Sequence, residues 1–294
     1  MTIELNQFMD KYKQILNEQL LKKISELEAP PKLKEAMAYS LKAGGKRIRP
    51  LLLFAVIESC GKNPMLGLPV ALALEMVHTY SLIHDDLPSM DNDDLRRGLP
   101  TNHKVYGEAM AILAGDGLLT YGFELIAADS SLDPATRIHM IRLLAQCAGP
   151  EGMVGGQVAD LEGENQALAI NELEHIHHRK TGKLLSFAIL AGAQIGGARE
   201  DQIRSFQKFS YHLGLGFQIS DDILDVEGDE DLLGKPVGSD TGKHKSTYPA
   251  LLSMEGAKKQ LEYHIDEAKS ALRETKLSTG LLEQITDLIA VRTF

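Results

Sequence analysis

The sequence predicts an all-α fold, a large bundle of about ten or more helices around a central cavity. Apolar residues recur at helical spacing in one segment after another, as they do at Phe8, Tyr12, Ile15, Leu16 and Leu20. Patterns that alternate apolar and polar residues, which are typical of strands, are almost absent. Clusters of turn residues separate the periodic segments into lengths that suit helices.

Proline and glycine mark the ends of the expected helices. The breaks fall at Ala29-Pro30-Pro31, Gly61-Lys62-Asn63-Pro64, Leu87-Pro88, Leu99-Pro100, Asp133-Pro134, Gly149-Pro150 and the Gly228–Gly242 loop. The segments Leu68–Asp86, Gly107–Ala128 and Asn171–Ala193 are apolar over most of their circumference, which predicts helices at the centre of the bundle. No linker long enough to separate two domains occurs, so we expect residues 1–294 to form a single domain.

Composition and charge exclude several classes of protein. With 44% hydrophobic and 24% charged residues, the chain has the composition of an ordinary folded protein. The net charge of -10 argues against a protein that binds nucleic acid through its phosphates. Charged residues interrupt the apolar pattern of Met1–Leu21 and of Ala109–Ala128, so we expect neither a leader nor a membrane span. Cys60 and Cys147 are expected to be buried free thiols, which suits a cytoplasmic protein.

An aspartate cluster ends one of the apolar helical segments, where residues 217–225 read Phe-Gln-Ile-Ser-Asp-Asp-Ile-Leu-Asp. Asp221 and Asp225 are four residues apart, so on a helix their Cβ atoms lie about 5–6 Å apart. Two carboxylates at this distance repel each other, and a bound hard cation is a natural reason for the arrangement. Magnesium suits a site built from carboxylate and phosphate oxygens.

A second aspartate cluster lies earlier in the chain, at Asp85, Asp86 and Asp91. In a straight helix Asp85 and Asp91 would lie on different faces. Pro88 must end or bend that helix, so we expect the chain to fold back and bring Asp91 toward Asp85. A calcium-binding EF-hand loop does not fit, because Arg96 stands where that loop requires glycine.

Cations accompany both acidic clusters. Either cluster alone could be a solvated acidic helix end, but Arg96 and Arg97 follow one, and Lys235, Lys243 and Lys245 follow the other. Carboxylate-bound metal and guanidinium groups together make a clamp for a diphosphate. The segment Gly44–Pro50 adds three cations at an expected helix N-terminus, which predicts a phosphate site without metal.

Six motifs, in this order along nearly the whole chain, resemble those of the trans-type short-chain prenyl diphosphate synthases, most closely the bacterial farnesyl diphosphate synthases. They are Gly44-Gly45-Lys46-Arg47-x-Arg49-Pro50, the run from Leu82 to Arg97, Gly155-Gly156-Gln157-x-x-Asp160, Lys180-Thr181-Gly182, Phe217-Gln218-x-x-Asp221-Asp222-x-x-Asp225, and Gly234-Lys235. The resemblance implies the isoprenoid synthase fold, a homodimer, and dimethylallyl or geranyl diphosphate and isopentenyl diphosphate as substrates.

The resemblance also implies a role for individual residues. It implies that three Mg²⁺ ions per site are held by Asp85, Asp86, Asp91, Asp221 and Asp225, with Asp222 in support. The allylic diphosphate would be neutralised by Arg96, Lys180, Lys235 and Lys245. Isopentenyl diphosphate would be bound by Lys46, Arg49, His78 and Arg97. Oxygen atoms facing the allylic cation would come from Lys180, Thr181 and Gln218.

The expected reaction ionises the allylic diphosphate, joins the cation to the alkene of isopentenyl diphosphate, and passes the last proton to the released diphosphate. Product length should depend on what blocks an apolar tunnel along the helix before Asp85. A residue five positions earlier lies about 7.5 Å down the helix axis. That residue is Tyr80, and a helical wheel places Ser81 nearer the Asp85 face. The resemblance favours Tyr80 as the floor and a C15 product.

Four alternatives remain on the sequence alone. A longer-chain synthase that makes C20 products differs from the favoured assignment only in product length. A non-catalytic partner subunit would retain the fold, although such proteins usually lose aspartates that are present here. A terpene cyclase has no use for the cationic segment Gly44–Pro50. An acidic calcium-binding protein would not explain Lys46, Arg49, Arg96 and Lys235.

Overall fold

The computed structural model describes residues 2–164, 166, 168–228 and 246–291, and these form an all-α bundle, as the sequence predicts. Its elements are α1 (Ile3–Ser25), α2 (Pro31–Lys42), α3 (Ile48–Ser59), the 3-10 turn η1 (Pro64–Gly67), α4 (Leu68–Asp85), β1 (Leu95–Arg96), β2 (Leu99–Pro100), α5 (Asn102–Tyr106), α6 (Glu108–Ala127), α7 (Pro134–Ala148), α8 (Met153–Gly163), α9 (Ile170–His177), the π-helical turn η2 (His178–Gly182), α10 (Lys183–Gly196), α11 (Glu200–Glu227), α14 (Tyr248–Glu274) and α15 (Gly280–Val291). The two short strands pair as an antiparallel hairpin.

Helix ends follow the punctuation of the sequence. Pro31 and Pro134 each occupy the first turn of a helix, where the missing N–H of proline costs nothing. Asp133 caps α7 by accepting hydrogen bonds from the backbone N–H groups of Ala135 and Thr136. The expected loop Gly228–Gly242 lies outside the described residues, except for Gly228.

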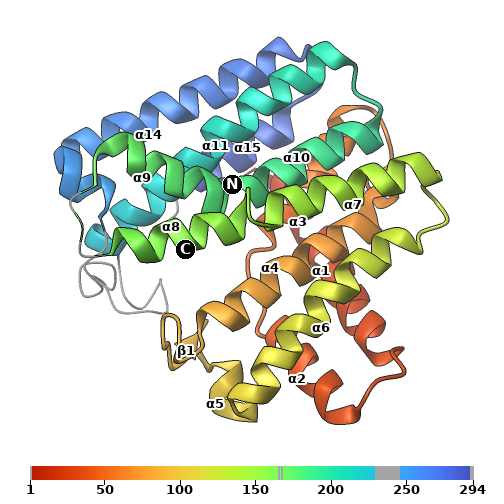
Figure 1. Cartoon of the computed structure of the whole chain (residues 1–294). Coiled ribbons are helices and arrows are strands. Elements are labelled where there is room, and N and C mark those ends of the chain that lie inside the picture. Colours follow the sequence, from red (N-terminus) through yellow and green to blue (C-terminus); the bar gives the residue numbers. More distant parts are fainter. Residues whose placement is uncertain (1, 165, 167, 229–245, 292–294) are drawn as a thin grey trace.

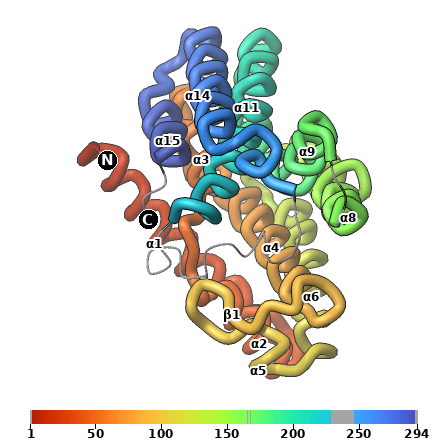
Figure 2. Tube along the Cα trace, turned by 90° about the vertical axis from the view of Figure 1, so that its left-hand side faces the viewer, coloured from red at the N-terminus to blue at the C-terminus, as the bar shows by residue number. Residues whose placement is uncertain are grey.

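Helices α3, α4 and α10 form the centre of the bundle. Ten of the twelve residues of α3 are buried, and α4 and α10 are buried along most of their length. Figure 1 shows α4 and α6 side by side, with α11, α14 and α15 along the opposite edge. Figure 2 shows the β1–α5 segment at the far end of the molecule from α14. One apolar cluster draws buried residues from α1 through α15.

Helix α6 differs from the expectation that other helices would surround it. It packs on α2, α4, α5 and α7, but its other face remains exposed. Leu113 on that face is 53% exposed. The apolar sequence therefore predicted the helix correctly. It could not show whether the apolar face packs within the protein or stays exposed.

The predicted central helix Asn171–Ala193 is continuous in the structure but not uniform. Helices α9 and α10 are joined by η2, a turn in which the backbone hydrogen bonds take the wider π pattern. Such turns are rare, and they occur often at functional sites. Here the turn contains Lys180 and Thr181, both expected to face a substrate.

The segment Pro64–Asp85 and α6 are long and apolar enough to cross a membrane by length and composition. The share of the apolar window that is buried is 67% in the first and 39% in the second. Core helices of soluble proteins have the same length and composition. Cys60 and Cys147 are both free thiols, as expected, but only Cys147 is buried and Cys60 is half-buried.

Candidate active site

The first aspartate cluster lies where α4 ends. The helix stops at Asp85, and the following residues turn back, as the position of Pro88 predicts. The backbone N–H of Asp91 donates to the carbonyl of Asp85 at 2.8 Å, so the two residues lie together. The pKa of Asp85 is raised to about 6, chiefly by burial; the charge of Lys180 lowers it and the charge of Asp91 raises it. A cation between these carboxylates would remove this repulsion.

Asp86 has a different environment from Asp85. It is 3% exposed, and its Oδ1 accepts a hydrogen bond from Nε of Arg96 and forms an ion pair with Nη2, both at 2.6 Å. Burial raises the pKa of Asp86, while the bonded Arg96 lowers it. Arg96 also lies 3.6 Å from Asp93. The structure therefore pairs an expected metal ligand with an expected diphosphate ligand.

The second aspartate cluster lies in the last two turns of α11. Asp221 and Asp225 are one turn apart on this helix, as their spacing predicts. Asp222, between them, is 1% exposed and its carboxylate is bound by protein groups. Its Oδ1 accepts from Nε2 of Gln218 at 3.1 Å, and its Oδ2 accepts from the backbone N–H of Tyr248 at 3.0 Å. Asp222 thus supports Gln218 and the start of α14.

The π-helical turn η2 presents Lys180 and Thr181 to the site. Nζ of Lys180 donates to Oδ2 of Asp160 on α8 at 2.7 Å. Oγ1 of Thr181 donates to Oε1 of Gln218 at 3.1 Å, and Asp222 fixes the other end of that amide. Gly156 permits the close approach of α8, because a Cβ there would lie 2.3 Å from the backbone N of Lys180.

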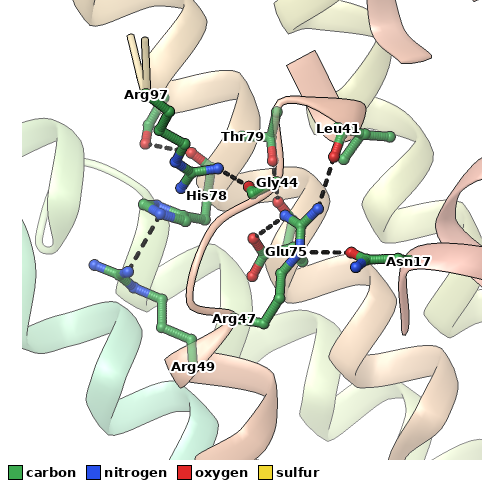
Figure 3. Close-up of polar contacts among 10 residues, drawn as sticks. Asn17, Leu41, Gly44, Arg47, Arg49, Glu75, His78, Thr79 and Arg97 are labelled. Atoms are coloured by element: carbon green, nitrogen blue, oxygen red, sulfur yellow. Dashed lines mark hydrogen bonds and ion pairs between the residues drawn. The ribbon is translucent and has the colours of Figure 1, made fainter. Parts of the chain in front are cut away.

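The cationic segment Gly44–Pro50 lies beside α4. Nη1 of Arg49 is 3.3 Å from Nε2 of His78, and Arg97 donates to the carbonyl of Gly44 (Figure 3). Burial lowers the pKa of Arg49 to about 10. Burial and the nearby arginines together hold the pKa of His78 well below its usual value, so this imidazole is neutral. Lys46 is exposed at the same loop.

Two cavities adjoin at these residues. A cavity of about 600 Å³ is lined by the cationic residues Lys46, Arg49, Arg96 and Arg97, and also by Phe217 and Asp221. A second, of about 520 Å³, is more apolar and has Asp85 and Lys180 in its wall. Both cavities are lined by Arg49, His78, Leu82 and Thr181, which form a shared wall. Among the described residues, Nε of Arg49 and Nε2 of Gln157 are buried donors without a protein partner.

Tyr80 and Ser81 both line the more apolar cavity. Tyr80 is 7% exposed, and its ring packs edge-on against His84, with ring centres 5.4 Å apart. His84 is held in turn by its ring Nε2, which lies 3.1 Å from the carbonyl oxygen of Ile112 on α6. The hydroxyl of Ser81 donates to the carbonyl of His78, on its own helix.

Lys235, Lys243 and Lys245 lie outside the described residues, as does Gly234. Two residues with clear roles were not assigned from the sequence. Asp160 binds Lys180, and its only signal was its place in one of the six motifs. Glu75 is a buried carboxylate within an apolar helix, and an isolated charge in such a helix is itself a signal.

His177, three residues before Lys180, is a buried residue that the sequence analysis did not assign. His177 is 8% exposed and stacks on Tyr248, with ring centres 5.8 Å apart. Its Nε2 lies 3.7 Å from Oδ2 of Asp222. The α9 helix turns this residue toward α14, and sequence spacing alone does not reveal that contact.

A model of the polyprenyl synthetase family matches residues 30–282. The chain belongs to the polyprenyl synthetase family. It is 58% identical over 292 residues to a farnesyl diphosphate synthase of Geobacillus stearothermophilus, covering 99% of this chain and 98% of that one. It is 54% identical over 294 residues to a farnesyl diphosphate synthase of Bacillus subtilis, covering 99% of both chains.

Solved structures of similar proteins share the fold of this polyprenyl synthetase family member. The apo structure of a Zymomonas mobilis FPP/GFPP synthase aligns with a TM-score of 0.88 at 35% identity, covering 98% of this chain and 100% of that one. A Helicobacter pylori geranyltransferase, complexed with magnesium and isoprenyl diphosphate, aligns with a TM-score of 0.81 at 33% identity, covering 96% of both chains.

Proposed function

We propose that the chain is a magnesium-dependent prenyltransferase that adds isopentenyl diphosphate to dimethylallyl and then geranyl diphosphate, making farnesyl diphosphate. The observation that carries this proposal is the pair of adjoining cavities, one cationic and one largely apolar, with Asp221 lining the first and Asp85 the second. Relatives that are more than half identical along nearly the whole chain are farnesyl diphosphate synthases, which supports the same activity.

The aspartates fit Mg²⁺, which prefers oxygen ligands and is usually held by one or two carboxylates together with substrate phosphates. Among the described residues, no three His, Cys, Asp or Glu side chains already form a metal-binding group. This agrees with a site that substrate oxygens complete. We assign Asp85, Asp86, Asp91, Asp221 and Asp225 as the ligands of three ions. Bound Mg²⁺ would stabilise the negative charge of the departing diphosphate.

The chain's own residues bind and orient the two substrates. Lys46, Arg49 and Arg97 supply positive charge for isopentenyl diphosphate, and neutral His78 supplies a hydrogen bond. Arg96 and Lys180, with Lys235 and Lys245, neutralise the allylic diphosphate. When the allylic C–O bond breaks, its electron pair leaves with the diphosphate. The carbonyl of Lys180, the hydroxyl of Thr181 and the amide of Gln218 then present oxygen atoms to the cation.

The new bond forms when the alkene of isopentenyl diphosphate attacks the allylic carbon. The proton lost in the next step passes to the released diphosphate, so the protein need not supply a base. The growing chain extends into the more apolar cavity, away from Asp85. Tyr80 blocks its growth, with Ser81 beside it, and this sets the product at C15.

We also propose a single domain over residues 1–294, a homodimer and a cytoplasmic location. The apolar cluster shared by helices from α1 through α15 supports a single domain. The exposed apolar face of α6 supports association with a second copy. The free thiols of Cys60 and Cys147 suit a reducing compartment.

The test is incubation of the purified chain with dimethylallyl diphosphate, isopentenyl diphosphate and Mg²⁺, followed by chromatographic sizing of the product. Farnesyl diphosphate is expected, and chelation of the metal should abolish its formation. A C20 product would instead identify a geranylgeranyl diphosphate synthase, a class represented by a relative from Cyanophora paradoxa at 47% identity. Absence of any prenyl product would indicate a non-catalytic partner subunit.

A further inference from the structure

Arg47 stands between Lys46 and Arg49 in the cationic segment, yet its side chain is used differently. It is 3% exposed, and its guanidinium is satisfied by protein groups. Nε donates to Oδ1 of Asn17 at 3.0 Å, Nη1 donates to Oε1 of Glu75 at 2.6 Å, and Nη2 donates to the carbonyl of Leu41 at 2.6 Å (Figure 3). The guanidinium of Arg47 thus borders the cationic cavity, but three protein acceptors hold it in place.

The partners of Arg47 come from three helices. Asn17 lies on α1, Leu41 on α2 and Glu75 on α4, so one side chain ties the loop before α3 to all three. The loop has reason to need such an anchor. Gly44 and Gly45 have φ of 80° and 130°, and Arg47 itself has φ of 54°. A non-glycine residue in this region is strained and keeps its conformation only where the surroundings impose it.

The same loop positions the groups proposed to bind isopentenyl diphosphate. The carbonyl of Gly44 accepts a hydrogen bond from Arg97. A Cβ on Gly45 would lie 2.6 Å from the guanidinium carbon of Arg97, so the loop backbone packs directly on that group. Lys46 is the next residue, and Arg49 follows two residues after Arg47. A displaced loop would therefore move several of these cations together.

Glu75 connects this loop to α4. It is 2% exposed and lies one helical turn before His78, which contacts Arg49. The charge of Glu75 raises the pKa of Arg49 and of Arg97, and it opposes the effect of burial on both groups. Its carboxylate thus offsets the repulsion within the cationic cavity before an anionic substrate enters.

We propose that Arg47 and Glu75 are a positioning pair that holds the loop Gly44–Arg47 in the geometry that binds isopentenyl diphosphate. This inference rests on the proposed function, because it concerns the second substrate of that reaction. Both residues border the cationic cavity but are at most 3% exposed, so we assign them to positioning the loop and not to direct binding of the substrate. Their loss should weaken binding of isopentenyl diphosphate, while the groups assigned to the allylic diphosphate keep their affinity for that substrate.

A double substitution, Arg47→Met with Glu75→Met, tests the proposal. A single substitution would leave a buried charge without its partner, which is strongly destabilising. Replacing both members of a buried ion pair by apolar residues is often neutral for stability. The KM for isopentenyl diphosphate should rise about tenfold to 100-fold, since a misplaced binding group has an effect of that order. The KM for geranyl diphosphate and the melting temperature should stay near wild-type values.

The matched control is the exposed ion pair of Lys208 and Glu274, in which the Lys208→Met and Glu274→Met substitutions together should change neither KM. If the Arg47→Met/Glu75→Met variant does not fold, Arg47→Lys gives the same test, because lysine keeps the charge but not the three-way contact. A selective rise in the KM for isopentenyl diphosphate supports the proposal. An unchanged value, or an equal rise in both constants with a lower melting temperature, overturns it.

Calorimetry with isopentenyl diphosphate alone separates this inference from the proposed function. If the wild-type chain binds isopentenyl diphosphate and the folded variant binds it equally well, the proposed role of Arg47 and Glu75 is wrong, and the enzyme assignment stands. If the wild-type chain neither binds isopentenyl diphosphate nor forms a prenyl product, the proposed function is wrong.

Discussion

Asp85 and Asp221 line the two cavities directly, whereas Asp86 and Asp222 are bonded to protein groups. We therefore expect Asp85→Ala and Asp221→Ala each to lower turnover by at least about 100-fold, because each removes charge stabilisation at the departing diphosphate. Steady-state kinetics with geranyl and isopentenyl diphosphates measures this. Asp201→Ala, at an exposed carboxylate near the start of α11, is the control. Near-normal turnover in either site variant would contradict the metal-ligand assignment.

Asp222 is predicted to act chiefly on structure. Both of its partners, Gln218 and the N–H of Tyr248, are donors, and an asparagine offers only one acceptor oxygen. Asp222→Asn should leave one buried donor unsatisfied and lower the free energy of unfolding by about 1–3 kcal/mol. Urea denaturation measures this. Asp221→Asn is the control, because Asp221 lines a cavity, and its free energy of unfolding should be close to that of the wild type. Equal losses of stability in the two variants would refute a structural role specific to Asp222.

Sequence spacing could predict which carboxylates share a helix face, and it also predicted the turn after Asp85. It could not predict the partners of Asp86 and Asp222. Arg96 is ten residues from Asp86, and Tyr248 is 26 residues from Asp222. Each contact depends on where a loop or another helix packs, which local periodicity does not encode.

Helices α11 and α14 meet at a pair of histidines. Because of this pair, the stability of the protein should depend on pH. The two Nδ1 atoms of His212 and His264 lie 3.0 Å apart. Burial, with the neighbouring His212, lowers the pKa of His264 from 6.5 to about 4. The unfolded chain therefore binds a proton more readily than the folded chain. The stabilisation is complete above the unfolded pKa and is lost as pH falls from about 6.5 toward about 4.

This pH effect is measured by urea unfolding at about pH 7 and about pH 5. His264→Gln keeps a polar side chain but cannot titrate, so it should reduce the loss of stability between these values by about 1–3 kcal/mol. His139→Gln, at an exposed histidine on α7, should leave the loss unchanged. A wild-type pH dependence in His264→Gln would show that the buried pair does not titrate in this range.

Helix α4 is predicted to limit product length through Tyr80. Tyr80→Ala removes the ring that closes the more apolar cavity, so products longer than C15 should accumulate when isopentenyl diphosphate is in excess. Chromatographic sizing of the products measures this. Tyr80→Phe keeps the ring and should keep the C15 product. If Tyr80→Ala still stops at C15, another part of the cavity wall sets the length.

The positions of α4 and α6 could be predicted to within one residue, because each apolar segment begins directly after a glycine, Gly67 or Gly107. The π-helical turn within the expected helix Asn171–Ala193 could not. Its wider hydrogen-bond pattern depends on the packing of α8 and α11, where Gly156 and Gly214 allow the backbone to approach η2. Both glycines lie far from η2 in the sequence.

The whole molecule is predicted to associate through α6, which leaves Leu113 53% exposed beside Ile112. Light scattering should give twice the chain mass of 32.2 kDa for the wild-type protein. Leu113→Glu places a charge on the proposed contact and should give the mass of one chain. Val291→Glu, at an apolar residue that is 65% exposed on α15, is the control and should remain a dimer. A wild-type monomer would refute the proposed homodimer.

The wall shared by the two cavities has a consequence for the order of events in catalysis. In the proposed reaction the new bond forms across this wall, and the product retains the diphosphate of the second substrate, on the cationic side. For another round of growth that diphosphate must move from the groups assigned to isopentenyl diphosphate to those assigned to the allylic diphosphate. Each round of elongation therefore includes a translocation of the intermediate, and release into solvent competes with it. The balance between these two paths, as well as cavity depth, decides how much intermediate escapes before growth is complete.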